Sequence, residues 1–174
     1  MFLKKVYGFL AATFITIAAG AQQPAVKPQT NNAGYPIVQQ LDKTVTYASA
    51  TDVAALIDKA KTAAKGDAPM VVGEFLQLAP YTLTLEYHEK GKPLADVGVH
   101  PKVAELTYVI DGSGTLVTGG TRTADHMRIE GGESRKIAKG DFILVPEGVP
   151  HWISQVDQTL VLVSVHMPRQ VPAQ

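Results

Sequence analysis

The sequence predicts an all-β protein, an antiparallel jelly-roll β-barrel with one short helix before it. Two observations support this prediction. From Met70 onward, apolar and polar residues alternate with a period of two, as they do in half-buried strands. Glycine-rich turns then separate the strand segments at short intervals, which is typical of an antiparallel meander or jelly roll. No long helical pattern interrupts this region, so one barrel of at least seven strands is the simplest architecture.

The N-terminal segment, residues 1–21, has the layout of a secretory signal peptide. Lys4 and Lys5 precede an apolar run of about 14 residues, and Ala19-Gly20-Ala21 forms a small-residue cleavage site. An uncleaved anchor is the alternative, but that run is shorter than the ~20 residues a spanning helix needs. No cysteine follows the small residues, which excludes a lipid anchor at that position. We therefore expect a periplasmic or secreted protein that has no membrane partner after cleavage.

A leader and a helix should follow the signal segment. Residues 22–36 are rich in Gln, Pro, Asn, Ala and Gly and lack an apolar period, which favours a flexible leader, expected over residues 22–48. Residues 49–66 should contain a helix, with Thr51 as its N-cap and Gly66 at its end. Its apolar residues recur at helical spacing: Val53, Leu56, Ile57 and Ala60. We expect this helix to pack on the outside of the barrel.

The barrel domain is expected to span residues 67–170. The alternation in Tyr81–His88 places Leu83, Leu85 and Tyr87 on one face and Thr82, Thr84, Glu86 and His88 on the other. The remaining strands should lie at 105–110, 115–118, 126–130, 133–137, 142–145 and 160–167. Turns are expected at 111–114, 119–120, 131–132 and 139–140.

Composition limits the classes of partner. The chain has 16 basic and 16 acidic residues, so loss of the two signal lysines leaves a mature net charge of −2. This balance predicts no nucleic-acid partner and no attraction to a membrane surface. There is no cysteine, and a mature chain of about 150 residues is long enough to build a core without disulfides. A small-molecule substrate or ligand is the expected partner.

Two motifs carry most of the functional information. The first runs from His100 through Glu105 to Gly112, and the second contains Gly140, Pro146, Gly148 and His151. Their spacings resemble the two motifs of the cupin family, H-x-H-x(3–4)-E-x6-G and G-x5-P-x-G-x2-H-x3-N. Two positions depart from the family pattern: Gly98 stands where it has its first histidine, and Gln155 where it has its last asparagine.

The motif residues form a candidate metal site. His100, Glu105 and His151 provide two imidazoles and one carboxylate, a ligand set that holds a divalent transition metal and leaves positions open for water, substrate or dioxygen. Iron, manganese, nickel, copper and zinc are all compatible with it. Glu105 lies within an apolar strand, where a carboxylate without a cation or hydrogen-bond partner would be costly. The alternatives are an outward-facing glutamate and ordinary loop histidines.

The glycine at position 98 leaves three interpretations open. It vacates one metal position, or a histidine from another strand fills the gap, or the site is degenerate and holds no metal. His88 and His166 are the candidates for an additional ligand or a supporting contact, and Gln155 is a candidate for a polar contact. The alternatives are a solvated His88 and a His166 at the rim or in the core. His126 is expected at the surface.

Catalytic candidates beyond the metal ligands are few. Tyr108 and Glu86 are weak candidates for acid–base groups, and Tyr87 is a further one, although an aromatic residue in a strand is more often part of the core. Three arginines are expected on a solvated face, one of which is a candidate clamp for a substrate carboxylate: Arg122, Arg128 and Arg135. The chain has no nucleophile elbow, zincin motif or phosphate-binding loop.

Two classes of function remain. The resemblance implies a metal-dependent enzyme of the dioxygenase, isomerase, lyase or decarboxylase type, acting on a small polar organic molecule. The alternative is a non-catalytic barrel that binds a small molecule, with a degenerate metal site. The resemblance also implies pairing of barrels, so a homodimer is expected. A fold by itself does not separate these classes of function.

Overall fold

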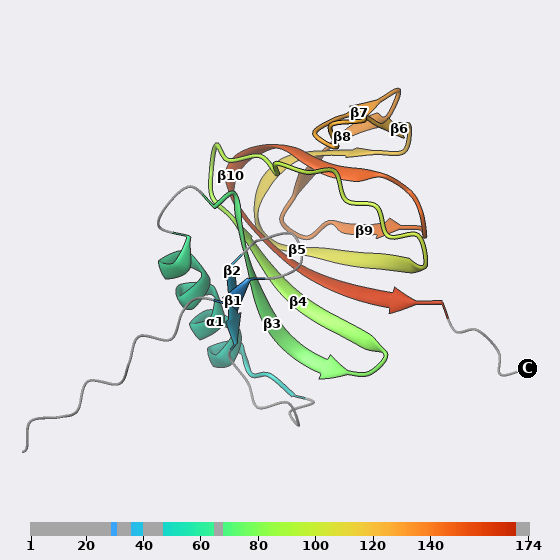
Figure 1. Ribbon diagram of the computed structural model, residues 1–174. Helices are drawn as coiled ribbons and strands as arrows, with labels where there is room; N and C mark the ends of the chain where they lie inside the picture. Colours follow the sequence, from blue (N-terminus) through green and yellow to red (C-terminus); the bar gives the residue numbers. More distant parts are fainter. Residues whose placement is uncertain (1–28, 31–35, 40–46, 65–67, 170–174) are drawn as a thin grey trace, which may run out of the picture.

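The computed structural model describes residues 29–30, 36–39, 47–64 and 68–169 (Figure 1). The predicted signal peptide, most of the predicted leader and the expected helix end at Gly66 lie outside the described residues. The domain boundaries given above therefore stay predictions. Among the described residues, no helix combines the length and the apolar character that crossing a bilayer requires.

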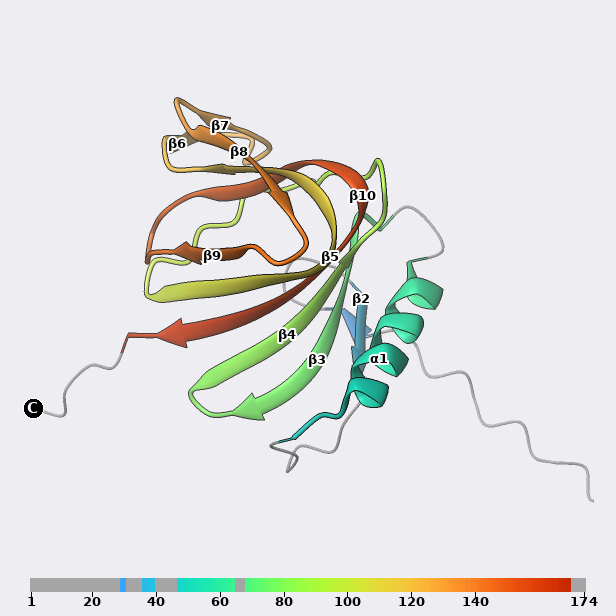
Figure 2. The same ribbon diagram turned by 180° about the vertical axis from the view of Figure 1, so that it is seen from behind.

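One long, strongly curved sheet dominates the fold, as predicted for an all-β protein. Its central strands are β3 (Met70–Leu78), β4 (Tyr81–His88), β10 (His151–Pro168) and β5 (Val103–Thr118). The order β3-β4-β10-β5 is antiparallel throughout. Two shorter strands, β8 (Glu133–Ala138) and β9 (Phe142–Val145), pair with the second and first halves of β5. Figures 1 and 2 show the sheet curling around on itself, as in a jelly-roll barrel.

Strands β5 and β10 are much longer than the sequence predicts. They pair from His151 opposite Thr118 to Pro168 opposite Val103, with several register shifts in between. The turn expected at residues 111–114 is wrong: β5 passes through this segment as one bent strand. Gly112 makes the bend possible, because its φ is +85° and a Cβ there would lie 1.9 Å from the Thr159 carbonyl oxygen. A glycine pair in this sequence therefore marks a bend as well as a turn.

The helix α1 (Ala50–Ala63) packs on the outer face of the sheet, as expected (Figure 2). Its N-cap is Ser49, which corrects the prediction of Thr51. The Ser49 hydroxyl accepts a hydrogen bond from the Asp52 amide at 3.2 Å, and the Asp52 carboxylate accepts one from the Ser49 amide at 2.9 Å. This reciprocal capping box fixes the start of the helix. The buried Leu56 and Ala60 then contact an apolar cluster on β3, β4 and β10: Val71, Leu85, Tyr87 and Val161.

The two faces of β4 separate the outer core from the barrel interior. Leu85 and Tyr87 face outward under α1, whereas Thr82, Thr84 and Glu86 line the interior cavity. This division follows the alternation read from the sequence. A second core cluster, contributed by β5, β8 and β10, is formed by Val109, Leu116, Ile137, Ile153, Val156, Leu160 and Leu162.

Three peripheral segments differ from the sequence predictions. Strands β1 (Gln29–Thr30) and β2 (Pro36–Gln39) lie within the expected leader, and β2 adds to β3 in parallel. The leader prediction is therefore corrected for these residues. The strand expected at 126–130 is reduced to β7 (Ile129–Glu130), which pairs with β6 (Thr121–Arg122). His126 itself is exposed, as expected, and has a φ of +65°, which belongs to a turn and not to a strand.

Candidate metal centre

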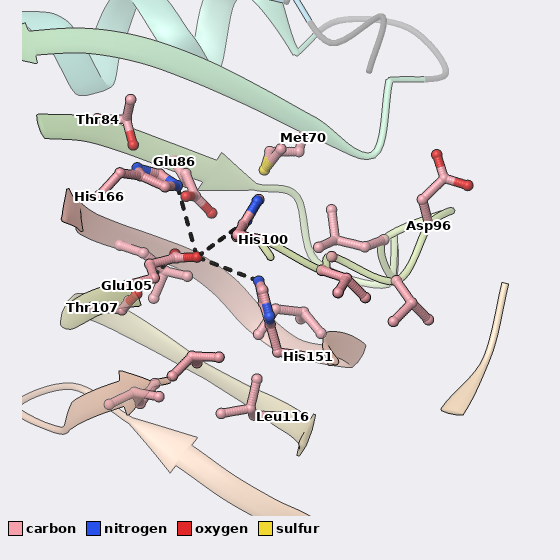
Figure 3. A pocket seen from close by; sticks show the side chains of 18 of the residues that line it. Met70, Thr84, Glu86, Asp96, His100, Glu105, Thr107, Leu116, His151 and His166 are labelled. Atoms are coloured by element: carbon pink, nitrogen blue, oxygen red, sulfur yellow. Dashed lines mark hydrogen bonds and ion pairs between the residues drawn. The ribbon is translucent and has the colours of Figure 1, made fainter. Parts of the chain in front are cut away.

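Four side chains from distant parts of the sequence meet on one wall of the interior. His100 lies in the segment before β5, Glu105 at the start of β5, and His151 and His166 near opposite ends of β10. His166 is the direct cross-strand partner of Glu105, so the antiparallel pairing alone brings these two together. Figure 3 shows the three imidazoles pointing toward the Glu105 carboxylate.

One carboxylate oxygen is the point on which the imidazoles converge. Glu105 Oε2 lies 3.3 Å from His151 Nε2, 3.6 Å from His100 Nε2 and 3.7 Å from His166 Nε2. Ligand atoms 2.0–2.2 Å from one metal ion stand roughly 3.0–3.5 Å apart. The candidate ligand atoms of His100, Glu105 and His151 also all lie within 4.8 Å of one another. The spacing therefore fits a single transition-metal ion with little rearrangement.

Supporting hydrogen bonds orient both kinds of ligand. His151 Nδ1 lies 3.1 Å from the Val149 carbonyl oxygen, which accepts its proton and directs Nε2 into the cavity. The Thr107 hydroxyl donates to Glu105 Oε1 at 3.1 Å and lies 2.9 Å from the Ser164 hydroxyl. Ser164 and Thr107 are both buried. One oxygen of Glu105 is thus held by the barrel wall while the other faces the histidines, as metal-ligating carboxylates require.

The electrostatics keep Glu105 ionised. Burial raises the pKa of this carboxyl, but the hydrogen bond and positive charge of His151, the charge of His166 and a hydrogen bond from Ser164 outweigh burial and lower the pKa to about 2. Burial lowers the pKa of His151, but the hydrogen bond and charge of Glu105 outweigh it and leave that pKa raised. Burial and the neighbouring His151 lower the pKa of His100, which favours its neutral, metal-binding form.

The glycine at position 98 has a direct structural role. Its backbone forms a bridge with His151, with amide-to-carbonyl hydrogen bonds of 2.9 and 3.0 Å in the two directions. A Cβ at this position would lie 2.6 Å from His151 Nε2, closer than a Cβ approaches such an atom. The His151 ring therefore occupies the space that a side chain at position 98 would need.

The centre opens into an interior cavity of about 470 Å³. Its walls include all four residues of the cluster together with Glu86 and Thr84, as well as Arg122 and Asp96. Half-buried Arg122 points its guanidinium toward the Val97 carbonyl oxygen at 3.5 Å. A volume of this size is in the range that holds a small organic molecule.

Most of the sequence that forms the barrel and its candidate metal centre matches a known protein family. Residues 92–170, which contain all four clustered side chains, match the sequence model of the cupin family. This match assigns the barrel region, residues 92–170, to the cupin family. The resemblance stated from the two motifs is thereby confirmed, and so is the all-β barrel fold. No curated protein matches the chain at a significant level.

The solved structures that resemble this chain share only a small part of its sequence. BH2720 from Bacillus halodurans has a TM-score of 0.49 at 18% identity, over 74% of this chain and 86% of that one. KdgF from a Halomonas species has a TM-score of 0.47 at 15% identity, over 59% and 82%. A predicted oxalate decarboxylase from Thermotoga maritima has a TM-score of 0.41 at 17% identity, over 51% and 66%. These similarities are too low to transfer a substrate or a reaction to this cupin.

The remaining candidates from the sequence divide into two groups. Glu86 lies in the cavity of the cupin barrel, and its Oε2 is 3.2 Å from Nε2 of His88. His88 is completely buried, which rules out the alternative of a solvated His88. Its ring is paired with Glu86 and does not line the cavity, which places it behind that carboxylate and not among the clustered histidines.

Two other candidates lie outside the cavity. Tyr108 is 37% exposed and packs its ring on Phe142 at a centroid distance of 4.6 Å, on the outer face of the barrel. Gln155 is exposed and hydrogen-bonded to Asp157. Neither residue therefore lies where a role in the site would require it. Alternation along β5 turns Tyr108 away from Glu105 and Thr107. The register shift between Ile153 and Gln155 carries Gln155 outward.

Some residues of the centre were missed by the sequence analysis. Thr107, Ser164 and Thr84 were not singled out as site residues, although they form one row across β5, β10 and β4. Two-residue alternation from Glu105 and His166 places Thr107 and Ser164 on the inner face, so this signal was present in the sequence. It becomes specific only when the pairing of β5 with β10 is known.

The contact between position 98 and His151 gives a testable prediction. Gly98→Ala should destabilise the metal-free protein by about 1–3 kcal/mol, because the new Cβ displaces the His151 ring. In a His151→Ala background the same substitution should cost almost nothing, since the ring that it strikes is gone. Chemical denaturation of the four proteins of this double-mutant cycle measures the difference. Equal costs in both backgrounds would show that the contact does not constrain position 98.

Proposed function

We propose that this chain is an exported cupin that binds one divalent transition metal and acts as a metal-dependent enzyme on a small organic molecule. The observation that carries the proposal is the convergence of His100, His151 and His166 on one ionised carboxylate oxygen of Glu105, at 3.6, 3.3 and 3.7 Å. A cluster this tight, built around a buried carboxylate next to a cavity and supported by oriented hydrogen bonds, resembles a prepared ligand set more than a chance meeting of polar groups.

His100, Glu105 and His151 would hold the metal, and His166 would supply a fourth donor. This fourth nitrogen would replace the histidine that the family pattern has at position 98. The His151 ring fills the space at Gly98, while His166 reaches the same carboxylate from the adjacent strand. Iron, manganese, nickel, copper and zinc all accept such a set, and four protein donors leave one or two positions open in a five- or six-coordinate site.

The proposed chemistry requires separate contributions from the metal and from the side chains of the protein. A bound metal supplies Lewis-acid polarisation of a substrate oxygen or activation of water or dioxygen. Glu86 is the acid–base candidate of the chain, because its carboxylate lines the same cavity and is oriented by His88 Nε2 at 3.2 Å. The barrel walls bind the substrate and exclude water from the polar wall.

A non-catalytic binding barrel is the second candidate function. The observation that favours it is the small number of acid–base groups in the cavity: apart from the four clustered residues, Glu86 and Asp96 are its only acidic or imidazole side chains among the described lining residues. The two functions share the metal centre and the cavity. Turnover of a bound ligand separates them.

Metal analysis tests the proposed centre. The mature protein, purified without chelator, should carry about one transition metal per chain, and His151→Ala should lose it. His166→Ala should keep a metal with at least tenfold lower affinity and one fewer imidazole, counted by electron paramagnetic resonance of the copper-loaded protein. His126→Ala, the same change at an exposed histidine, is the matched control.

Two results would contradict parts of this proposal. A wild-type protein that stays metal-free after incubation with iron, manganese, nickel and zinc would overturn the metal-dependent function. A His166→Ala protein with wild-type affinity and an unchanged number of imidazoles would remove His166 from the ligand set and leave the three-residue site in place.

Export is part of the proposal and rests on the layout of residues 1–21. When the full chain is produced in a bacterial host, the protein in the periplasmic or culture fraction should begin at Gln22, as measured by intact mass. Ala21→Lys should block this cleavage while leaving the rest of the chain unchanged. Recovery of only the uncleaved chain from the cytoplasm would contradict export.

We also propose that the barrel forms a homodimer through the outer face of β5 and β9. Phe142 is 71% exposed and Leu144 63% exposed, and together with Tyr108 they form an apolar patch. Among the described strands, β9 pairs only with β5, so its other edge is open. Phe142→Asp should shift the protein from dimer to monomer in sedimentation velocity at about 10 μM, whereas Met127→Asp, at another exposed apolar residue, should not. A monomeric wild type would refute this interface.

A further inference from the structure

The walls of the cavity are divided into a polar and an apolar part. Five polar residues of the lining lie on β4, the first half of β5 and the end of β10, in two cross-strand rows: Thr82, His166 and Glu105 in one, and Thr84 and Thr107, on either side of the buried Ser164, in the next. The other polar or charged residues of the lining are Glu86, Asp96, His100, Arg122 and His151. The candidate donors His100 and His151 adjoin this polar wall through their contacts with Glu105. The rest of the cavity is lined largely by aliphatic side chains, and Figure 3 shows several of them, including Leu116, on the side away from Thr84.

The apolar wall is built from fixed elements. Leu116 and Ile153 are cross-strand partners on β5 and β10, and both belong to the second core cluster. Leu94 closes over them: its amide donates to the Ile153 carbonyl at 3.1 Å, and its own carbonyl accepts from Trp152 Nε1 at 2.8 Å. Ile143 and Leu162 complete this wall. Because these positions are held by backbone hydrogen bonds and core packing, the apolar wall exists before any ligand arrives.

This division restricts what binds there. A polyol or sugar acid carries hydroxyl groups along its whole length, and those facing the aliphatic wall would lose water without gaining a partner. The polar wall, in contrast, offers a hydrogen-bonding group to a ligand. The Thr84 hydroxyl is buried without a hydrogen-bond partner in the described part of the chain, and Thr84 is 9% exposed. A buried hydroxyl of this kind is satisfied when a ligand supplies the missing group.

We propose that the ligand of this cavity has two parts: an oxygen-donor head that chelates the metal and meets Thr84, and an apolar body, aromatic or branched alkyl, that lies against Leu94, Leu116 and Ile153. This proposal rests on the proposed function, because the head requires the metal. It replaces the small polar molecule expected from the sequence, and it excludes sugars and short dicarboxylates as good ligands.

Three hydroxamates with the same chelating head test the proposal. The probes are acetohydroxamate, with almost no body, benzohydroxamate, with an apolar ring, and gluconohydroxamate, with a polyol body. Their binding to the protein loaded with one zinc ion per chain is measured by calorimetry. We expect benzohydroxamate to bind at least tenfold more tightly than acetohydroxamate, and gluconohydroxamate to bind no more tightly than acetohydroxamate.

Variants locate the effect in the cavity. Leu94→Ser trims the apolar wall from a partly buried position and should reduce the benzohydroxamate preference at least threefold, with acetohydroxamate binding unchanged. Leu144→Ser, the same change on the outer face of the barrel, should leave the preference intact. Thr84→Val should weaken all three probes alike, because the hydroxyl meets their shared head.

The failures of this proposal and of the metal centre are distinguishable. Zinc binding is measured first, and a protein that takes up no metal overturns the proposed function together with the chelating head. A zinc-loaded protein that binds the three hydroxamates with equal affinity, or prefers gluconohydroxamate, overturns the apolar body and leaves the metal centre standing. A preference that Leu94→Ser does not change places the apolar contact elsewhere and overturns the assigned wall.

Discussion

The buried negative charge of Glu105 is the constraint on which the rest of the interior depends. A carboxylate inside a barrel of aliphatic side chains is unfavourable unless cations and hydrogen-bond donors surround it. Here three imidazoles approach one oxygen, and the Thr107 hydroxyl holds the other. The inner row of threonine and serine side chains, the inward turn of both ends of β10 and the raised pKa of His151 all follow from keeping this charge satisfied.

The sequence predicted the class of fold and the central residues because both depend on local patterns. Alternation with a period of two put Leu85 and Tyr87 on the opposite face from Thr84 and Glu86, and in the structure the first pair lies under the helix and the second lines the interior. Motif spacing singled out His100, Glu105 and His151, which the structure brings within reach of one ion. Local patterns are enough here, since each residue's face is set by its own strand.

The errors arose where long-range pairing overrides local patterns. Gly112 reads as a turn residue, but its strand continues because β10 runs beside it for the whole length. His88 looks solvated next to a charged turn, yet strands β3 and β10 flank it and bury it completely. The choice between His88 and His166 was open for the same reason. Only the register of β10 against β5 shows that His166 stands opposite Glu105.

Strand β10 carries candidate donors at both of its ends, and this has a mechanical consequence. His151 and His166 are fifteen residues apart on one strand, which would be about 50 Å if the strand were straight. Both nevertheless lie within 3.7 Å of the same carboxylate oxygen, because the strand curls around the barrel. An ion held by both ends would act as a cross-link that closes this ring, in a chain that has no disulfide to do so. Occupancy of the centre would then set the rigidity of the barrel as well as its reactivity.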